Sequence, residues 1–246
     1  MRAWWSKTRR GNWGDDFNVP LLRHLTGATP THHHGPGKLL AVGSILHKLD
    51  DGDAVWGSGL LSPQHACGGK RGVRWFAVRG PHTRAVLQDC GYRGVPEIYG
   101  DPGLLVSQIY APSIEKRYRL GIVPHYVDYA GLKHLRATDV HVIDIRSGLE
   151  QVVSEVTACD QIQSSSLHGI IIAEAYSIPA TWLRVDWCSR IIGGEWKFRD
   201  YYAGTGRMDV VAVDIVSGGS EKMCCPMPPP DIDLHQLVAA FPKDLP

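Results

Sequence analysis

Short apolar runs alternate with amphipathic segments along the whole chain, and this alternation restricts the possible folds more than any other feature. Apolar runs such as 39–42 and 120–123 are each followed by a more polar stretch, which is typical of βα units on a mostly parallel sheet. With 246 residues, 43% of them hydrophobic, the chain is long enough to bury one large core or two smaller ones. The sequence therefore predicts an α/β fold.

A change of composition in the middle of the chain predicts two domains. Residues 111–119 are polar and charged, and a new series of apolar runs begins directly after them. We place an N-terminal domain at 1–112 and a C-terminal domain at 113–218. The tail, 219–246, is expected to be a proline-rich linker followed by one terminal helix.

The pattern also predicts individual elements. A proline opens the expected helix 81–89, where its missing N–H is harmless in the first turn. The expected strands are 39–42, 54–56, 74–78, 120–123, 141–145, 161–163 and 180–185, and the expected helices are 17–25, 81–89, 148–158, 166–176 and one within 232–241.

Charge and cysteine content exclude several classes of function. The 26 basic and 25 acidic residues give a net charge of +1, so no global field attracts nucleic acid or an anionic membrane, and an anion site must be local. The six cysteines form no C-x-x-C pair, and three consecutive histidines, 32–34, cannot all face one ion on an extended chain. We therefore expect no metal and no resident cofactor.

An apolar run long enough for a membrane span is absent from the sequence, and the N-terminus lacks a secretory apolar core. We expect a cytoplasmic protein. Peripheral association with the inner face of the membrane, through a polysaccharide-synthesis complex, is left open, as is the oligomeric state.

The clearest candidate site is the junction between a polar stretch and the apolar run 170–173. Ser165, Ser166, Leu167 and His168 stand there, where a loop is expected to enter a buried helix. The first N–H groups of a helix lack internal partners and carry partial positive charge, so with serine hydroxyls they form an anion pocket. His168 titrates near neutral pH and can act there as a proton donor or phosphate ligand.

Two glycine-containing turns are further candidates for substrate binding. Gly14 and Asp15 belong to a turn before the first helix, where glycine lets the backbone approach a ligand; a strand-to-helix turn with a cap is the alternative that the residues alone favour. Gly57, Ser58 and Gly59 follow an apolar strand and should lie at the carboxyl edge of the sheet, where α/β proteins bind ligands. A simple tight turn is the alternative.

Three charged residues complete the set. Arg79 follows the strand 74–78, and an arginine at that edge can grip a phosphate or carboxylate with two hydrogen bonds; a surface arginine is the alternative. Lys197 and Asp200 lie among aromatic residues after a double-glycine turn, where they bind substrate or simply open an amphipathic helix.

Seven motifs in this order resemble the polysaccharide pyruvyl transferases. The resemblance extends from about residue 10 to 206 and rests on Gly11-Asn12-Trp13-Gly14-Asp15, Trp56-Gly57-Ser58-Gly59, Val78-Arg79-Gly80-Pro81-His82-Thr83, Tyr99-Gly100-Asp101-Pro102, Leu120-Gly121-Ile122-Val123-Pro124-His125, Ser165-Ser166-Leu167-His168-Gly169 and Lys197-Phe198-Arg199-Asp200. It implies two Rossmann-like halves facing across a cleft, similar to GT-B glycosyltransferases. It also implies phosphoenolpyruvate as the donor substrate and a pyruvate ketal on a sugar as the product.

With this resemblance, the candidate residues take roles in exopolysaccharide or cell-surface glycan synthesis. Arg79 neutralises the carboxylate or phosphate of the donor, Ser165 and Ser166 hold the phosphate, and His168 is the acid or a phosphate clamp. Asp15 or Asp101 is the base, and the sequence does not choose between them. The saccharide acceptor is lipid-linked or nucleotide-linked. A nucleotide-sugar-dependent GT-B glycosyltransferase and a noncatalytic saccharide-binding protein are the alternatives.

Overall fold

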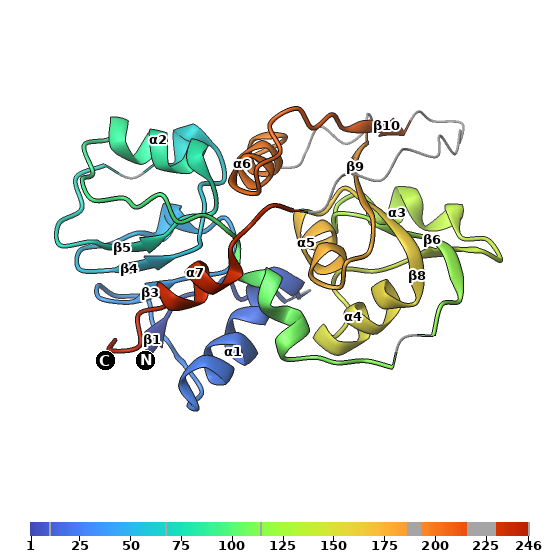
Figure 1. Cartoon of the computed structure of the whole chain (residues 1–246), viewed down its shortest axis with the longest axis horizontal. Helices are drawn as coiled ribbons and strands as arrows, with labels where there is room; N and C mark the ends of the chain where they lie inside the picture. Colours follow the sequence, from blue (N-terminus) through green and yellow to red (C-terminus); the bar gives the residue numbers. More distant parts are fainter. Residues whose placement is uncertain (10, 67, 114, 186–192, 216–229, 246) are drawn as a thin grey trace.

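Two parallel five-stranded sheets form the two halves of the protein (Figure 1). The computed structural model describes residues 1–245 except 10, 67, 114, 186–192 and 216–229. The N-terminal sheet contains β1 (Arg2–Ala3), β2 (Thr31–His32), β3 (Leu39–Leu40), β4 (Ala54–Trp56) and β5 (Arg74–Ala77). The C-terminal sheet contains β6 (Tyr118–Val123), β7 (Val140–Val142), β8 (Cys159–Ser164), β9 (Ala180–Val185) and β10 (Val213–Ile215).

Both sheets have the same strand order. It is β2-β1-β3-β4-β5 in the N-terminal sheet and β10-β9-β8-β6-β7 in the C-terminal sheet, so in each half the first strand lies between the second and the third. The direction of winding therefore reverses between β1 and β3 and again between β6 and β8. In open α/β sheets ligands bind beyond the carboxyl ends of the strands at such a reversal. The fold thus singles out one region of each half.

Helices cover the sheets and fill the space between them. The α-helices are α1 (Trp13–Thr26), α2 (Pro81–Asp89), α3 (Tyr129–Leu132), α4 (Leu149–Thr157), α5 (Leu167–Ala175), α6 (Trp196–Gly204) and α7 (Leu234–Ala239). The 3₁₀ helices are η1 (Leu46–Lys48), η2 (Pro63–His65), η3 (Pro102–Gln108) and η4 (Lys133–Leu135).

Most predicted elements are present, and the differences have local causes. Strand β4, helix α2 and strand β9 have the predicted bounds. Helix α1 begins at Trp13, ahead of the predicted start at 17, because the Asp16 carboxylate accepts a hydrogen bond from the Asn12 N–H and stabilises an earlier first turn. Gly14 and Asp15 are therefore helical residues, not part of a preceding turn. Strands β1, β2 and β10 were not predicted because two or three residues show no periodicity.

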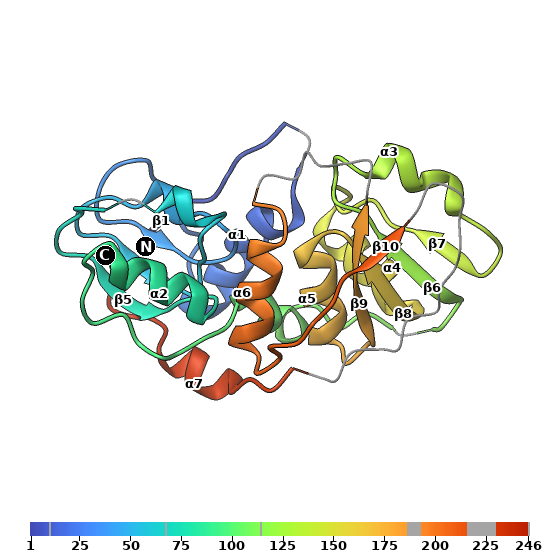
Figure 2. The ribbon, with the colours of Figure 1, turned by 90° about the horizontal axis from the view of Figure 1, so that it is seen from above.

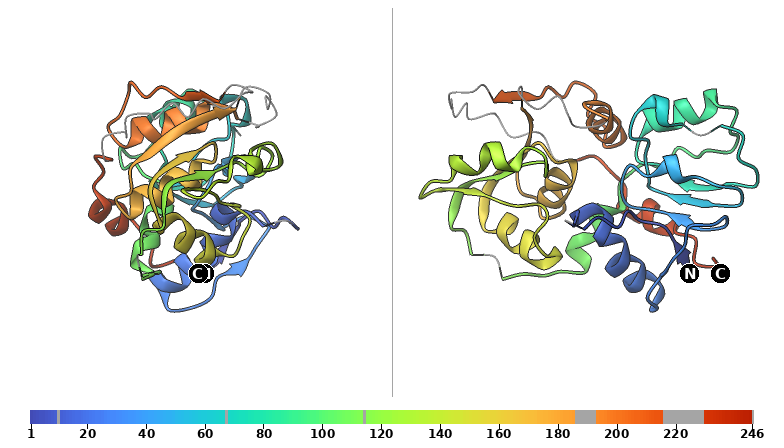
Figure 3. Two further views of the ribbon diagram at one scale, coloured as in Figure 1. Left: turned by 90° about the vertical axis from the view of Figure 1, so that its right-hand side faces the viewer. Right: turned by 180° about the vertical axis from the view of Figure 1, so that it is seen from behind.

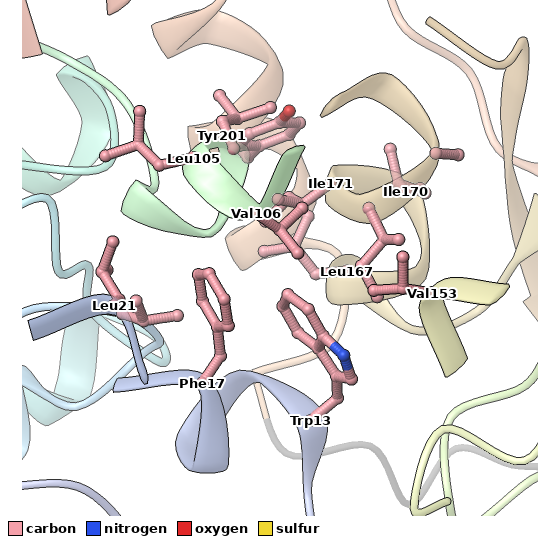
Figure 4. Close-up of a cluster of buried hydrophobic side chains, with 14 of the residues drawn as sticks. Trp13, Phe17, Leu21, Leu105, Val106, Val153, Leu167, Ile170, Ile171 and Tyr201 are labelled. Carbon is pink, nitrogen blue, oxygen red and sulfur yellow. The ribbon is translucent and has the colours of Figure 1, made fainter. Parts of the chain in front are cut away.

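One hydrophobic core continues from one half into the other (Figure 4). Trp13 and Phe17 of α1 stack with ring centroids 4.7 Å apart, and they belong to the same buried cluster as Leu167 and Ile171 of α5 and Val106 of η3. Close-packed interiors resist displacement of their side chains. The relative position of the two halves is therefore set by packing beneath the region where they face each other.

The last part of the chain returns to the N-terminal half. Helix α6 lies between the halves beside α2 (Figure 2). Further along, the Trp56 indole N–H donates to the Leu237 carbonyl at 2.8 Å, which attaches α7 to the N-terminal sheet. Both termini lie on this half (Figure 3). The chain thus crosses between the two sheets more than once.

Candidate active site

A cavity of about 240 Å³ lies where both sheets reverse their winding. Ser6 follows β1 and Ser44 follows β3 in one half, while His125 follows β6 and His168 follows β8 in the other, and all four line the cavity. Each of these residues comes after the carboxyl end of its strand. The site is thus placed by topology in both halves at once.

Helix α5 begins at this cavity, as the serine-histidine motif predicted. Ser166 is its N-cap and lines the cavity, and its side chain does not cap the helix. Instead, the Ser164 hydroxyl accepts the Ser166 N–H at 3.0 Å. The first N–H groups of α5 and the positive end of its dipole are therefore directed at a region that can hold an anion.

Ser165 has a different role from the one predicted. It is buried, its hydroxyl donates to the Asp128 carboxylate at 2.6 Å, and it accepts the His125 N–H at 2.9 Å. These two bonds join the loop after β6 to the loop after β8. In the structure Ser165 positions His125 and is not part of the cavity wall.

His168 projects from the first turn of α5 into a closely fitted space. Its Nε2 atom is buried without a hydrogen-bond partner and lies 3.9 Å from the Asp101 carboxylate. Burial, followed by the positive charges of Lys197 and Arg79, lowers the pKa of His168 to about 3. Without a ligand the imidazole is therefore neutral at physiological pH.

Gly14 provides the space for this imidazole. A Cβ atom on Gly14 would lie 2.0 Å from His168 Cε1, far closer than any real contact. We predicted that this glycine admits a ligand backbone; in the structure it admits the His168 ring. The next residue, Asp15, lines the cavity, accepts a hydrogen bond from the Asn12 amide at 2.6 Å, and has its pKa raised to about 6 by burial.

Lys197 supplies the cation of the cavity. Its side chain is largely buried at the start of α6, and within the described residues no carboxylate lies within ion-pair distance of its ammonium group. Burial and the neighbouring Arg79 lower the pKa of Lys197 to about 8, while Asp128 acts in the opposite direction. The lysine is thus mostly charged at pH 7 and available to an anion.

Arg79 and Asp200 bind each other. The Arg79 guanidinium is fully buried, with Nε 2.9 Å from Asp200 and Nη2 2.7 Å from the Leu60 carbonyl, and Nη1 also donates to the Ser44 hydroxyl. Asp200 additionally accepts the N–H and the hydroxyl of Thr83 at 2.8 and 2.7 Å. We predicted that both residues bind substrate directly. In the structure their side chains instead bind each other, although they are 121 residues apart in the sequence.

The glycine-serine turn after β4 supports that ion pair. A Cβ atom on Gly59 would lie 2.3 Å from the Arg79 guanidinium carbon, and one on Gly57 would lie 2.3 Å from Pro102. The Ser58 hydroxyl donates to the Gly43 carbonyl at 2.9 Å, and its side chain is buried. These three residues, predicted to bind substrate, shape the wall behind the cavity in this structure.

Sequence reasoning missed His125 as a site residue. His125 lines the cavity, and burial, with Lys197 and His168 nearby, lowers its pKa to about 3. It follows strand β6 just as Arg79 follows β5. The rule that singled out Arg79 could therefore have found it.

Two features are absent from the described part of the chain. Among the described residues, no group of histidine, cysteine, aspartate and glutamate has the arrangement needed to hold a metal ion. In the same part of the chain, the helices are too short or too polar to cross a membrane.

Two parallel five-stranded sheets with a cavity beside their reversal points define an α/β protein with two Rossmann-like halves. The chain belongs to the polysaccharide pyruvyl transferase family, whose model matches residues 70–186. No solved structure matches the chain significantly.

Two relatives extend this match. The chain is 34% identical over 209 residues to "Uncharacterized protein L143" of Acanthamoeba polyphaga mimivirus, covering 79% of this chain and 71% of that protein. It is 27% identical over 210 residues to "Succinoglycan biosynthesis protein ExoV" of Rhizobium meliloti (strain 1021), covering 80% of this chain and 63% of that protein. Both alignments are long enough to include residues outside the family model.

Proposed function

We propose that the protein transfers the pyruvyl group of phosphoenolpyruvate to two hydroxyls of one saccharide, forming a cyclic ketal during synthesis of an exopolysaccharide or cell-surface glycan. Family membership supports the pyruvyl transfer, and the name of the succinoglycan relative supports a polysaccharide product. The observation that carries the donor assignment is the cavity, in which the Lys197 ammonium, the start of α5 and the His168 imidazole lie together.

The donor needs these three features. Phosphoenolpyruvate carries a phosphate and a carboxylate, so the unpaired Lys197 and the N–H groups after Ser166 suit its charge. Arg79 acts from behind the cavity wall. Its guanidinium is paired with Asp200 and also donates a hydrogen bond to Ser44, which lines the cavity. Because Lys197, Ser166 and Leu167 in the cavity wall are buried, the charges beside them are screened less by water than charges at the surface.

Donor binding also prepares the acid. The neighbouring cations and burial keep His168 neutral in the empty cavity. A bound phosphate and carboxylate reverse the local field and favour the imidazolium. His168 then gives a proton to the methylene carbon of the donor, which makes the adjacent enol carbon electrophilic.

The remaining steps form the cyclic ketal and release phosphate, and every proton is accounted for. One saccharide hydroxyl adds to the enol carbon and loses its proton, for which Asp15 is the base because its carboxylate lines the cavity and its pKa lies near neutrality. The phosphate then leaves, and the second hydroxyl attacks the same carbon. Of the two hydroxyl protons, one replaces the proton given to the methyl group and the other leaves with phosphate. The acceptor's two hydroxyls must be held together for the ring to close.

The test is turnover with isolated components. Phosphate release from phosphoenolpyruvate is followed in the presence of lipid-linked and nucleotide-linked saccharides, and the new ketal methyl group is detected by NMR. The His168→Gln variant should lose at least about 100-fold in kcat, while His24→Gln, which alters an exposed histidine on α1, should match wild type. Sugar transfer from a nucleotide sugar without any use of phosphoenolpyruvate would show a glycosyltransferase instead.

A further inference from the structure

Two buried polar atoms beneath the cavity lie close to each other. Nε2 of His168 and Oδ2 of Asp101 are 3.9 Å apart, and neither has a partner at normal hydrogen-bonding distance among the described residues, although the nearby Gly43 N–H lowers the pKa of the Asp101 carboxyl. A buried polar group without a partner costs free energy. Two such groups directed at each other indicate that this structure shows one state of a contact that closes in another.

The structural role of Asp101 uses only half of its carboxylate. Oδ1 accepts the Gly103 N–H at 2.9 Å and so caps the start of η3. An asparagine would cap equally well. The second oxygen, and the negative charge, are not needed for that role, although the side chain is fully buried.

We propose that Asp101 is the hydrogen-bonding partner of the His168 imidazolium, so that the two residues form a proton-carrying pair that charges when donor binds. A movement of about 1 Å brings the two atoms into hydrogen-bonding distance. The proposal rests on the function proposed above. It assigns Asp101 as a positioning residue that acts through His168, and leaves Asp15 as the carboxylate that reaches the acceptor.

The two nitrogens of the His168 ring have different roles in this proposal. The Cδ2 edge of His168 lies 3.8 Å from the position of a Cβ on Gly103, beside Asp101, so Nε2 faces the carboxylate and Nδ1 lies on the side away from it. In the charged pair, Nε2–H donates to Asp101 and Nδ1–H is free to transfer its proton to the donor. A carboxylate behind a histidine fixes the ring orientation and stabilises its charged form.

The charges and the burial around the pair explain why the histidine is neutral before donor binds. Burial raises the pKa of Asp101 to about 6 and lowers that of His168 to about 3, and Arg79 acts in the same direction on the histidine. At pH 7 the Asp101 carboxylate is therefore mostly ionised, while burial opposes the imidazolium until an anion enters, so that charging His168 takes up one proton. The titratable and charged groups around this region are Asp15, His47, Arg79, Asp101, His125, Asp128, Lys197 and Asp200.

The decisive readout is proton uptake. Calorimetric titration of the full chain with phosphoenolpyruvate at pH 7, in buffers of different ionisation enthalpy, counts protons bound with the donor. Lys197 contributes little at this pH, because it is already mostly charged. Wild type should take up close to one proton per donor, and Asp101→Asn should lose most of this uptake while still binding.

A matched variant and kinetics complete the experiment. Asp139→Asn removes the same charge from an exposed pair with Arg119 of β6, away from the cavity, and should retain the uptake. Asp101→Asn should lower kcat about 100-fold with KM for the donor changed less than threefold. Adding His168→Gln should cost little more, because the pair acts as one unit.

Three results would overturn the proposal. One is equal proton uptake by Asp101→Asn and wild type, and another is full additivity of the two substitutions. The third needs no variant to fold: in isotope-labelled wild type, the His168 ring signals should change to those of the imidazolium on donor binding, and signals that stay neutral contradict the pair. Absence of any binding by wild type would instead reject the donor assignment, and the pair with it.

Discussion

Replacing Gly14 by alanine separates the active-site role of this glycine from its effect on the helix. Gly14 lies inside α1, where alanine is favoured over glycine by about 1 kcal/mol. The new Cβ, however, would lie 2.0 Å from His168 Cε1 and 2.3 Å from both ring nitrogens. Since carbon atoms need about 3.5 Å, the ring must move by about 1.5 Å.

The expected effects follow from that displacement. Overpacking of this kind costs about 1–3 kcal/mol, which the helix propensity partly offsets, so stability should fall by no more than about 2 kcal/mol. A catalytic group displaced by about 1 Å costs on the order of 100-fold in rate. Gly14→Ala should therefore be folded and almost inactive.

Chemical denaturation and phosphate release measure the two quantities. Gly148→Ala is the control, because Gly148 caps α4, has a φ of −52° and has nothing within 4 Å of its Cβ position. In a His168→Ala background the sign should reverse, and Gly14→Ala should stabilise by up to about 1 kcal/mol. An active Gly14→Ala enzyme, or equal destabilisation with and without the imidazole, would refute the reasoning.

Three further outcomes are expected. Lys197→Met should raise KM for phosphoenolpyruvate about 10- to 100-fold, and wild-type KM should rise above pH 8 as the lysine, whose pKa is lowered to about 8, loses its charge; a flat pH profile contradicts this. The His125 pKa is lowered from 6.5 to about 3, so the neutral histidine contributes to stability above pH 6.5, and this contribution is lost as the pH falls toward 3. In urea titrations, the free energy of unfolding of His125→Gln should therefore decrease less between pH 6.5 and pH 3 than that of wild type. Asp200→Asn should destabilise by about 3–5 kcal/mol because it leaves the buried Arg79 charge unpaired, whereas Asp214→Asn, in an exposed pair, should leave the stability nearly unchanged.

Local patterns in the sequence predicted the α/β class, the start of α5 and its histidine, because each depends on neighbouring residues. The same patterns could not show that Arg79 pairs with Asp200, since the two are 121 residues apart and only the packing of α6 beside α2 joins them. Nor could they show that Gly14 faces His168. Gly14 and Arg79 were both predicted as candidate binding residues, but the groups they contact are set by the tertiary fold.

The shared cavity has an equally nonlocal origin. Most of its residues follow β1, β3, β6 and β8, and the fold brings these four ends together. The sequence could indicate that polar residues follow strands. It could not indicate which strands are neighbours, and so could not show that His125 shares a cavity with His168 while Ser58 lies behind its wall.

The most direct test is a crystal structure of the protein with bound phosphoenolpyruvate. The account predicts the phosphate at the start of α5, within hydrogen-bonding distance of Ser166 and Lys197, and the methylene carbon beside Nδ1 of His168, with Nε2 now bonded to Asp101. A donor bound away from this cavity, or one held by Arg79 after release from Asp200 with His168 turned aside, would contradict it.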